Sequence, residues 1–150
     1  VAEALSSMRT VNRLDVEGEL RSAIHAATDV TGFGILGHGL HVAEGSAVSL
    51  HIDAGAVPLL DGARDTLSRS ILTKAHVTTT RYVEPHVAGR DGVDEVSWWT
   101  LVDPQTSGGL LLSVDAVRAG ALLDAIRERF PRAEIIGRVA ERLGAALHLG

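Results

Sequence analysis

Stretches with the spacing of β-strands alternate along this chain with stretches that have the spacing of helices, and this alternation most constrains the fold. Residues 47–53 carry apolar side chains at every second position, which is typical of a half-buried strand. Residues 110–114 are almost continuously apolar, which predicts a buried central strand. Further strands are expected at residues 24–28, 134–139 and 145–149, the last two joined by a turn. Strands that alternate with helices predict a layered α/β domain.

Helices are expected between these strands. They cover residues 1–13, 32–44, 56–69 and a stretch after Asp115 in which apolar side chains recur at helical spacing. Gly45 is suited to end the second of them, because glycine adopts a left-handed backbone conformation without strain. Asp115 can cap the last of them, because its carboxylate can accept a hydrogen bond from a free backbone N–H group.

The segment over residues 70–100 carries the weakest structural signals. The three threonines at positions 78–80 favour an extended backbone, because β-branched side chains are enriched in strands. Residues 90–92, with the sequence Arg-Asp-Gly, are typical of a turn. The pair Trp98-Trp99 could contact a partner, but such a pair more often has one buried ring and one partly exposed ring.

The composition limits the class of protein. A chain of 150 residues is enough for one domain with its own core, which must be aliphatic because aromatic residues make up only 3%. The net charge of −5 and the lack of a basic stripe argue against a nucleic-acid-binding surface. The apolar stretches are too short to cross a membrane. The absence of cysteine excludes disulfides and thiolate metal sites, and it fits a cytoplasmic setting.

The first candidate site is the string Asp29-Val30-Thr31-Gly32-Phe33-Gly34, which follows the first expected strand. Ligands of layered α/β folds gather at the carboxyl ends of strands, and Asp29 would lie at such an end. Because Mg²⁺ binds through one or two carboxylates together with phosphates and water, Asp29 could form part of a metal site. The alternative is that Asp29 and Thr31 only cap the following helix. The spacing alone leaves both interpretations open.

The second candidate site is the string Asp103-Pro104-Gln105-Thr106-Ser107-Gly108-Gly109, which precedes the apolar stretch at residues 110–114. The backbone amides of residues 107–109 could form an anion-binding loop, assisted by the hydroxyl groups of Thr106 and Ser107. The alternative is a strained turn that needs glycine for its dihedral angles. The two strings are far apart in the sequence, so a compact fold could bring them together at one phosphate-binding site.

The seven histidines of the chain raise the possibility of a metal site. His38 and His41 lie three positions apart on one expected helix, with Glu44 one step further along, and this arrangement could hold Zn²⁺. No further ligand with a regular spacing follows them. Exposed or hydrogen-bonded surface histidines are therefore the simpler interpretation.

The two strings also resemble the signatures of a known family. The stretch from Ala27-Thr28-Asp29 to Gly37-His38 closely resembles one signature of selenophosphate synthetase (selenide, water dikinase), and residues 103–111 resemble its second signature. The resemblance covers essentially the whole chain, residues 1–150, as a single domain that corresponds to the C-terminal half of the family's protein. It implies a three-layer α/β/α domain with a mixed sheet, as in the aminoimidazole ribonucleotide synthetase superfamily.

This resemblance implies a role in an ATP-dependent reaction that converts selenide and water to selenophosphate, AMP and phosphate. In the family, the aspartate that corresponds to Asp29 helps to bind the Mg²⁺ that bridges the ATP phosphates. The resemblance implies no firm ligand role for the loop from Thr106 to Gly109. The catalytic cysteine or selenocysteine and most ATP-binding residues belong to the family's N-terminal half. The chain is therefore expected to be inactive alone, to work with that half, and to form a homodimer as the full-length enzyme.

One stretch departs from the family's pattern. Residues 74–90 lack the Gly-Gly-Thr-x-x-Asn pattern of many bacterial members, so no role can be carried over to them. Two alternatives to the synthetase domain remain open. The chain could be a standalone phosphate- or nucleotide-binding module that regulates a partner, or part of another ATP-using enzyme of the same superfamily.

Overall fold

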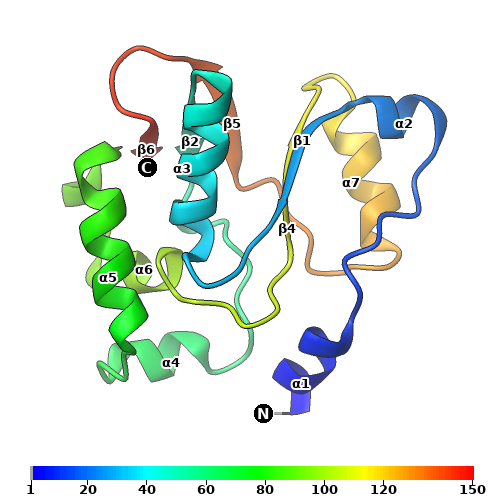
Figure 1. The fold of residues 1–150 in the computed structure, drawn as a ribbon. Helices are drawn as coiled ribbons and strands as arrows, with labels where there is room; N and C mark the ends of the chain where they lie inside the picture. Colours follow the sequence, from blue (N-terminus) through cyan, green and yellow to red (C-terminus); the bar gives the residue numbers. More distant parts are fainter. Residues whose placement is uncertain (1) are drawn as a thin grey trace.

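The structure, a computed structural model, describes residues 2–150 (Figure 1). Its α-helices are α1 (Ala2–Arg9), α2 (Gly18–Ser22), α3 (Gly34–Ser46), α4 (Ala63–Ser68), α5 (Lys74–Val83), α6 (Glu95–Leu101) and α7 (Ala119–Arg127), with short 3₁₀ helices η1 (Glu84–His86) and η2 (Arg90–Gly92). Its strands are β1 (Ile24–Asp29), β2 (Val48–Ile52), β3 (Val87–Ala88), β4 (Leu110–Val114), β5 (Gly137–Glu141) and β6 (Leu147–Leu149). No helix among these residues has the length and apolar character that a membrane crossing needs. The expected α/β class is confirmed.

The larger sheet is mixed and has the strand order β3-β6-β2-β5. In its middle, Leu50 of β2 pairs with Leu147 of the parallel strand β6, while β5 runs antiparallel on the other side of β2. The segment between β5 and β6 is therefore not a hairpin turn, because β2 separates the two strands. This segment crosses the end of β2, where the Ser49 hydroxyl donates a hydrogen bond to the carbonyl of Ala145 (2.8 Å).

Strands β1 and β4 form a separate antiparallel ribbon, in which Asp29 pairs with Leu110. The expectation of a buried central strand over residues 110–114 is wrong, because all five residues of β4 are only half-buried. Within residues 2–150, β4 has β1 as its one strand partner. A continuous apolar run shows that a strand has apolar neighbours, but not whether both of its faces are covered.

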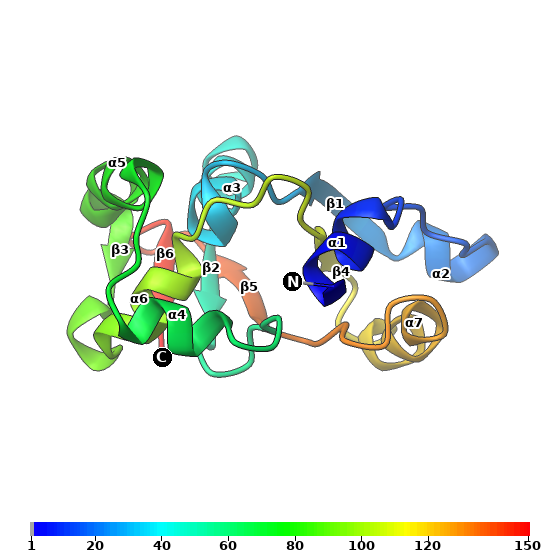
Figure 2. The ribbon, with the colours of Figure 1, turned by 90° about the horizontal axis from the view of Figure 1, so that it is seen from below.

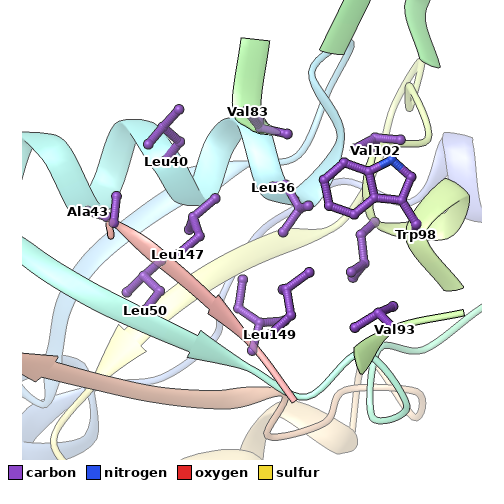
Figure 3. Close-up of a cluster of buried hydrophobic side chains, with 13 residues drawn as sticks. Leu36, Leu40, Ala43, Leu50, Val83, Val93, Trp98, Val102, Leu147 and Leu149 are labelled. Carbon is purple, nitrogen blue, oxygen red and sulfur yellow. The ribbon is translucent and has the colours of Figure 1, made fainter. Parts of the chain in front are cut away.

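One hydrophobic core lies between α3, α5, α6 and a face of the larger sheet (Figure 3). It packs aliphatic side chains from α3 and the sheet around the buried ring of Trp98. The Trp98 Nε1 group donates a hydrogen bond to the Thr80 hydroxyl (3.1 Å), which satisfies its polar edge. Trp99 is half-buried. The expectation of an aliphatic core, and of one buried and one partly exposed tryptophan, is confirmed.

The three threonines at residues 78–80 lie in helix α5 and not in an extended segment. This helix begins with a capping box. The Thr73 side chain accepts the backbone N–H group of His76, and His76 Nδ1 accepts the backbone N–H group of Thr73 and contacts its hydroxyl. Thr79 is buried, and the Thr78 hydroxyl bonds to the carbonyl one turn earlier (3.1 Å). Capping and burial therefore override the weak β-propensity of threonine. The turn expected at residues 90–92 is present as η2.

Two predicted helices are shorter in the structure. α1 ends at Arg9, and Val1, where the prediction begins, lies outside the described residues. Beyond α1, the chain turns so that the Asn12 side chain reaches the β1–β4 ribbon. α4 covers residues 63–68 only, because its N-cap residue Gly62 has a left-handed backbone (φ 81°).

Both capping expectations are wrong. The expectation that Gly45 ends the helix is wrong, since α3 continues to Ser46 and Ala47 takes the left-handed conformation (φ 53°). Asp115 does not cap α7 either, because the N-cap residue is Arg118 and no side chain caps it. Asp115 Oδ1 instead accepts the N–H groups of Val117 (3.0 Å) and Arg118 (3.2 Å) in the turn that precedes the helix.

The elements form two regions that lie side by side in both views (Figures 1 and 2). We call α3 to α6 with the four-stranded sheet the sheet region, and α1, α2, α7 with β1 and β4 the ribbon region. Figure 2 shows the ribbon region as an extension beyond β5, connected to α3 through the end of β1. The candidate site lies in the ribbon region, near this connection.

Candidate functional site

The fold brings the two candidate strings into contact. The Val30 N–H group donates to the carbonyl of Gly109 (2.9 Å), and the Gln105 N–H group donates to the carbonyl of Thr31 (3.0 Å). These bonds continue the β1–β4 pairing beyond the ends of the strands. The first loop, residues 29–34, and the second loop, residues 103–109, therefore form one surface.

Asn12 connects the two loops through its side chain. Its Nδ2 group donates to Asp29 Oδ1 (2.9 Å) and to the carbonyl of Gly108 (2.8 Å). The Ser107 hydroxyl donates to the carbonyl of Met8 (3.2 Å), which adds a second contact between this segment and the second loop. From the sequence, Asn12 is only a position near the apolar stripe of the helix expected over residues 1–13.

A cleft of about 460 Å³ opens where these segments meet. Its walls come from residues 8–12, from Asp29 and Thr31 of the first loop, and from residues 106–108 of the second loop. The fold thus gathers Asp29 at one cleft with Thr106, Ser107 and Gly108, while Gly109 adjoins the cleft through the bond to Val30.

Asp29 is exposed and does not cap α3. The N-cap residue of α3 is Phe33, and no side chain caps it. Among the described residues, the Asp29 carboxylate accepts one side-chain hydrogen bond, from Asn12 to Oδ1, which leaves Oδ2 available to a ligand. Thr31 does not cap α3 either, since its N–H group and hydroxyl both contact His38 Nε2 at 3.0 Å. The structure therefore contradicts the interpretation that Asp29 and Thr31 only cap the helix.

At two positions of these loops, a side chain larger than that of glycine would clash with the backbone. Gly34 has a left-handed backbone (φ 60°), and a Cβ atom there would lie 2.7 Å from the carbonyl carbon of Val102. At Gly108, a Cβ atom would lie 2.4 Å from the carbonyl oxygen of Val30. Gly108 is therefore needed for the close approach of the two loops, and its φ is not positive.

The second loop presents polar groups at the surface. Thr106 and Ser107 are exposed. Among the described residues, the backbone N–H groups of residues 106–109 donate no hydrogen bond to another part of the backbone. Amides without partners beside exposed hydroxyls can bind an anion, so the loop keeps the chemistry that its sequence indicates.

The histidines near the site do not form a zinc site. His41 Nε2 contacts the Tyr82 hydroxyl (3.0 Å), and Glu44 pairs with Arg142 (2.7 Å). Within residues 2–150, no group of three or more His, Cys, Asp or Glu side chains could hold a metal ion. Burial lowers the pKa of His38 below its ordinary value, the nearby His41 lowers it further, and the Asp29 charge partly opposes both. A neutral His38 suits its role as acceptor for the Thr31 N–H group.

The sequence matches the family described as AIR synthase related protein, C-terminal domain, over residues 1–150. The chain belongs to this family. Curated relatives of this AIR synthase related domain are selenide, water dikinases. Those of Bdellovibrio bacteriovorus and Nitrosomonas eutropha are each 42% identical over 149 residues, which is 98% of this chain and 42% of the relative. The chain therefore spans about two fifths of the length of these relatives.

Solved structures share the fold of this domain. The thiamine-monophosphate kinase of Stenotrophomonas maltophilia matches with a TM-score of 0.56 and 26% identity, over 87% of this chain and 33% of the kinase. The hydrogenase maturation protein HypE matches with a TM-score of 0.56 and 20% identity, over 85% of this chain and 34% of HypE. The expected α/β fold with a mixed sheet, of the AIR synthase type, is confirmed.

Proposed function

We propose that this domain forms one wall of the Mg²⁺-ATP site of a selenophosphate synthetase, with Asp29 as a ligand of the metal. The relatives named selenide, water dikinase support the reaction class. The observation that carries the assignment is the link from Asn12 to both Asp29 Oδ1 and the carbonyl of Gly108. This link holds an exposed carboxylate beside a loop of free amides at one cleft.

The residues at this cleft fit a Mg²⁺ ion that is bound mainly through its substrate. Mg²⁺ prefers oxygen ligands and commonly takes one or two carboxylates together with phosphates and water. Asp29 offers one carboxylate with an oxygen available, so the rest of the coordination sphere would come from ATP phosphates, water and the remaining part of the protein. When bound, the ion would neutralise phosphate charge during phosphoryl transfer. The proposal therefore includes weak Mg²⁺ binding by this chain alone.

The residues of the chain have separate roles in this proposal. Asp29 holds the metal, and Asn12 orients the Asp29 carboxylate through Oδ1. The amides of residues 106–109 and the Thr106 hydroxyl would face phosphate oxygens, whereas the Ser107 hydroxyl donates to the carbonyl of Met8. The nucleophile and most of the ATP site belong to the N-terminal half of the same enzyme, so this domain alone does not turn over ATP and selenide. The full-length enzyme acts in the cytoplasm as a homodimer.

The test is Asp29→Asn in the full-length protein that carries this domain. Asparagine keeps the size of the side chain and an oxygen that can accept from Asn12, but it removes the negative charge that the metal needs. Selenophosphate formation should fall by at least about tenfold to a hundredfold, since even residues that only orient metal ligands cost that much. The melting temperature should stay close to that of the wild type, and high Mg²⁺ should restore part of the activity.

Asp124→Asn is the matched control, because Asp124 is exposed on α7 and forms none of the ion pairs or side-chain hydrogen bonds described within residues 2–150. It makes the same chemical change and should leave both activity and melting temperature unchanged. Near-normal turnover of Asp29→Asn at ordinary Mg²⁺ concentration would reject Asp29 as a metal ligand. A loss of activity that is accompanied by an equal loss in the control would point to a general charge effect.

A further inference from the structure

A buried histidine lies behind the second loop. His76 is on α5, and only 2% of its surface is exposed. Its Nδ1 atom accepts the N–H group of Thr73 (3.1 Å) at the start of the helix. A backbone N–H group can only donate, so Nδ1 carries no proton and the ring proton lies on Nε2. The capping box therefore fixes the tautomer and the orientation of the ring.

The protonated nitrogen of this ring faces Asp103, the first residue of the second loop. His76 Nε2 lies 2.9 Å from Asp103 Oδ1, although the N–H group does not point squarely at the oxygen. The nitrogen is fully buried and has no hydrogen-bond partner among the described residues, so Asp103 is the group that compensates it. Burial raises the pKa of the Asp103 carboxyl, and the adjacent His76 and the hydrogen bond from Gln105 offset part of this effect. A half-buried carboxylate with a fixed donor on one side has little freedom to move.

From Asp103, a short chain of contacts reaches the candidate metal ligand. The Gln105 side chain bonds to Asp103 Oδ2, and the Gln105 N–H group donates to the carbonyl of Thr31 (3.0 Å). Thr31 is two residues from Asp29 in the first loop. The contacts therefore run from the buried ring, through the second loop, to the first loop. His76 itself is buried and does not line the cleft.

We propose that His76 is a positioning residue for the candidate site, which sets the second loop, and through it the first loop, by its Nε2 contact with Asp103. The assignment of the site itself rests on the proposed function, but the positioning of the loops does not. Amide exchange of the Gln105 and Val30 N–H groups reports directly on the bonds between the two loops.

Two substitutions separate the two nitrogens of the ring. His76→Asn places an amide near the position of Nδ1, so it can keep the contact with Thr73 but loses the group that faces Asp103. His76→Gln is longer and can place its amide N–H group near the position of Nε2. If the proposal holds, His76→Asn increases exchange at Gln105 and Val30 by roughly five- to a hundredfold, which is the range for a half-buried carboxylate that loses the polar group facing it. His76→Gln should restore most of the protection.

The reference is the Leu50 N–H group, which donates to the carbonyl of Ala146 (2.9 Å) in the sheet region. The measurement is hydrogen exchange in the full-length protein that carries this domain. Unchanged exchange in His76→Asn would overturn the proposal. An equal increase at Leu50 would also overturn it, because the residue would then only support global stability. Equal effects of Asn and Gln would reject the contact with Asp103 as the cause.

The same measurement on Asp29→Asn distinguishes this inference from the proposed function. Asp29→Asn should leave exchange at Gln105 unchanged, whatever it does to activity. If Asp29→Asn keeps full activity while His76→Asn still loosens the loops, the proposed function fails and the positioning role stands. If Asp29→Asn is inactive while His76→Asn leaves the loops unchanged, the proposed function stands and the positioning role of His76 fails.

Discussion

The sheet region and the ribbon region of this domain differ in how completely they bury their apolar side chains. The sheet region holds one cluster of thirteen buried residues, drawn together in Figure 3. In the ribbon region, by contrast, none of the described residues of α1 is buried, and every residue of β4 is half-buried. Leu5, Met8 and Val11 leave much of their apolar surface exposed. Most of the stability of the domain should therefore come from the sheet region.

The candidate site lies on the less buried of the two regions. Its geometry therefore depends on individual hydrogen bonds, such as those from Asn12, and not on a surrounding core. A site of this kind can adjust when a ligand binds, because regions with few buried contacts open at low free-energy cost. It is also sensitive to single substitutions that leave the overall fold intact.

The largest effect is expected from removing a leucine in the sheet region. Leu40 on α3 is 1% exposed, and Leu40→Ala should lower the free energy of unfolding by about 2–5 kcal/mol. The matched change is Leu5→Ala on α1, where 50% of the side chain is exposed and the loss should stay below about 1 kcal/mol. Urea unfolding of both variants measures the difference. Similar losses at the two positions would show that the ribbon region contributes as much to stability as the sheet region.

A smaller and local effect is expected from Asn12. Asn12→Ala removes the donor shared by Asp29 and Gly108, so the two loops should separate more often. Exchange of the Val30 N–H group should rise by roughly three- to tenfold, since an exposed hydrogen bond of this kind contributes about 1 kcal/mol. Thr10→Ala is the control on the same segment, because within residues 2–150 the Thr10 hydroxyl bonds only to the carbonyl of Ser6. If both variants exchange like the wild type, Asn12 does not hold the site together.

The sequence predicts β2 of the sheet region better than β4 of the ribbon region, and the reason is burial. The apolar residues of β2 alternate in the sequence, and Leu50 and Ile52 are buried as this pattern predicts, although Ser49 is buried too. β4 is as apolar as a central strand but is half-buried, because its place in a two-stranded ribbon depends on contacts distant in the sequence. The sequence does not predict α5, because its threonines favour an extended backbone. In the structure, the capping box and the burial of Thr79 outweigh this β-propensity.

The same distinction applies to the candidate site. The sequence identifies Asp29 and the second loop, because an acidic residue and paired glycines after a strand are a local pattern. The sequence does not identify Asn12 or the roles of His38 and His76, since each acts through a residue or segment that only the fold brings close. Gly108 could be recognised as special, but its reason, the approach of the Val30 carbonyl, lies in the pairing of β1 with β4.

The smallest effect is expected from pH, and it tests the connection between the two regions. His38 is on α3 of the sheet region, and its Nε2 accepts the N–H group of Thr31 in the first loop (3.0 Å). Burial and the nearby His41 lower the pKa of His38 in the folded protein below its usual value of 6.5. The unfolded chain therefore binds this proton more strongly. The contribution of His38 to stability is present above about pH 6.5 and is lost as the pH falls through the lower, folded pKa.

An NMR titration of the histidine rings should give His38 a midpoint below 6.5, and the Thr31 amide should shift with the same midpoint because protonated Nε2 cannot accept its hydrogen. Stability in urea should fall on going from about pH 8 to about pH 5.5. Burial, Arg138 and His148 also lower the pKa of His51, so the stability of His38→Gln should still depend on pH. Only the difference in pH dependence between the wild type and His38→Gln reports on the contact between His38 and Thr31. A Thr31 amide that does not follow the His38 titration would mean that the first loop is held by the ribbon region alone, and that the two regions are less closely connected at the site than this contact indicates.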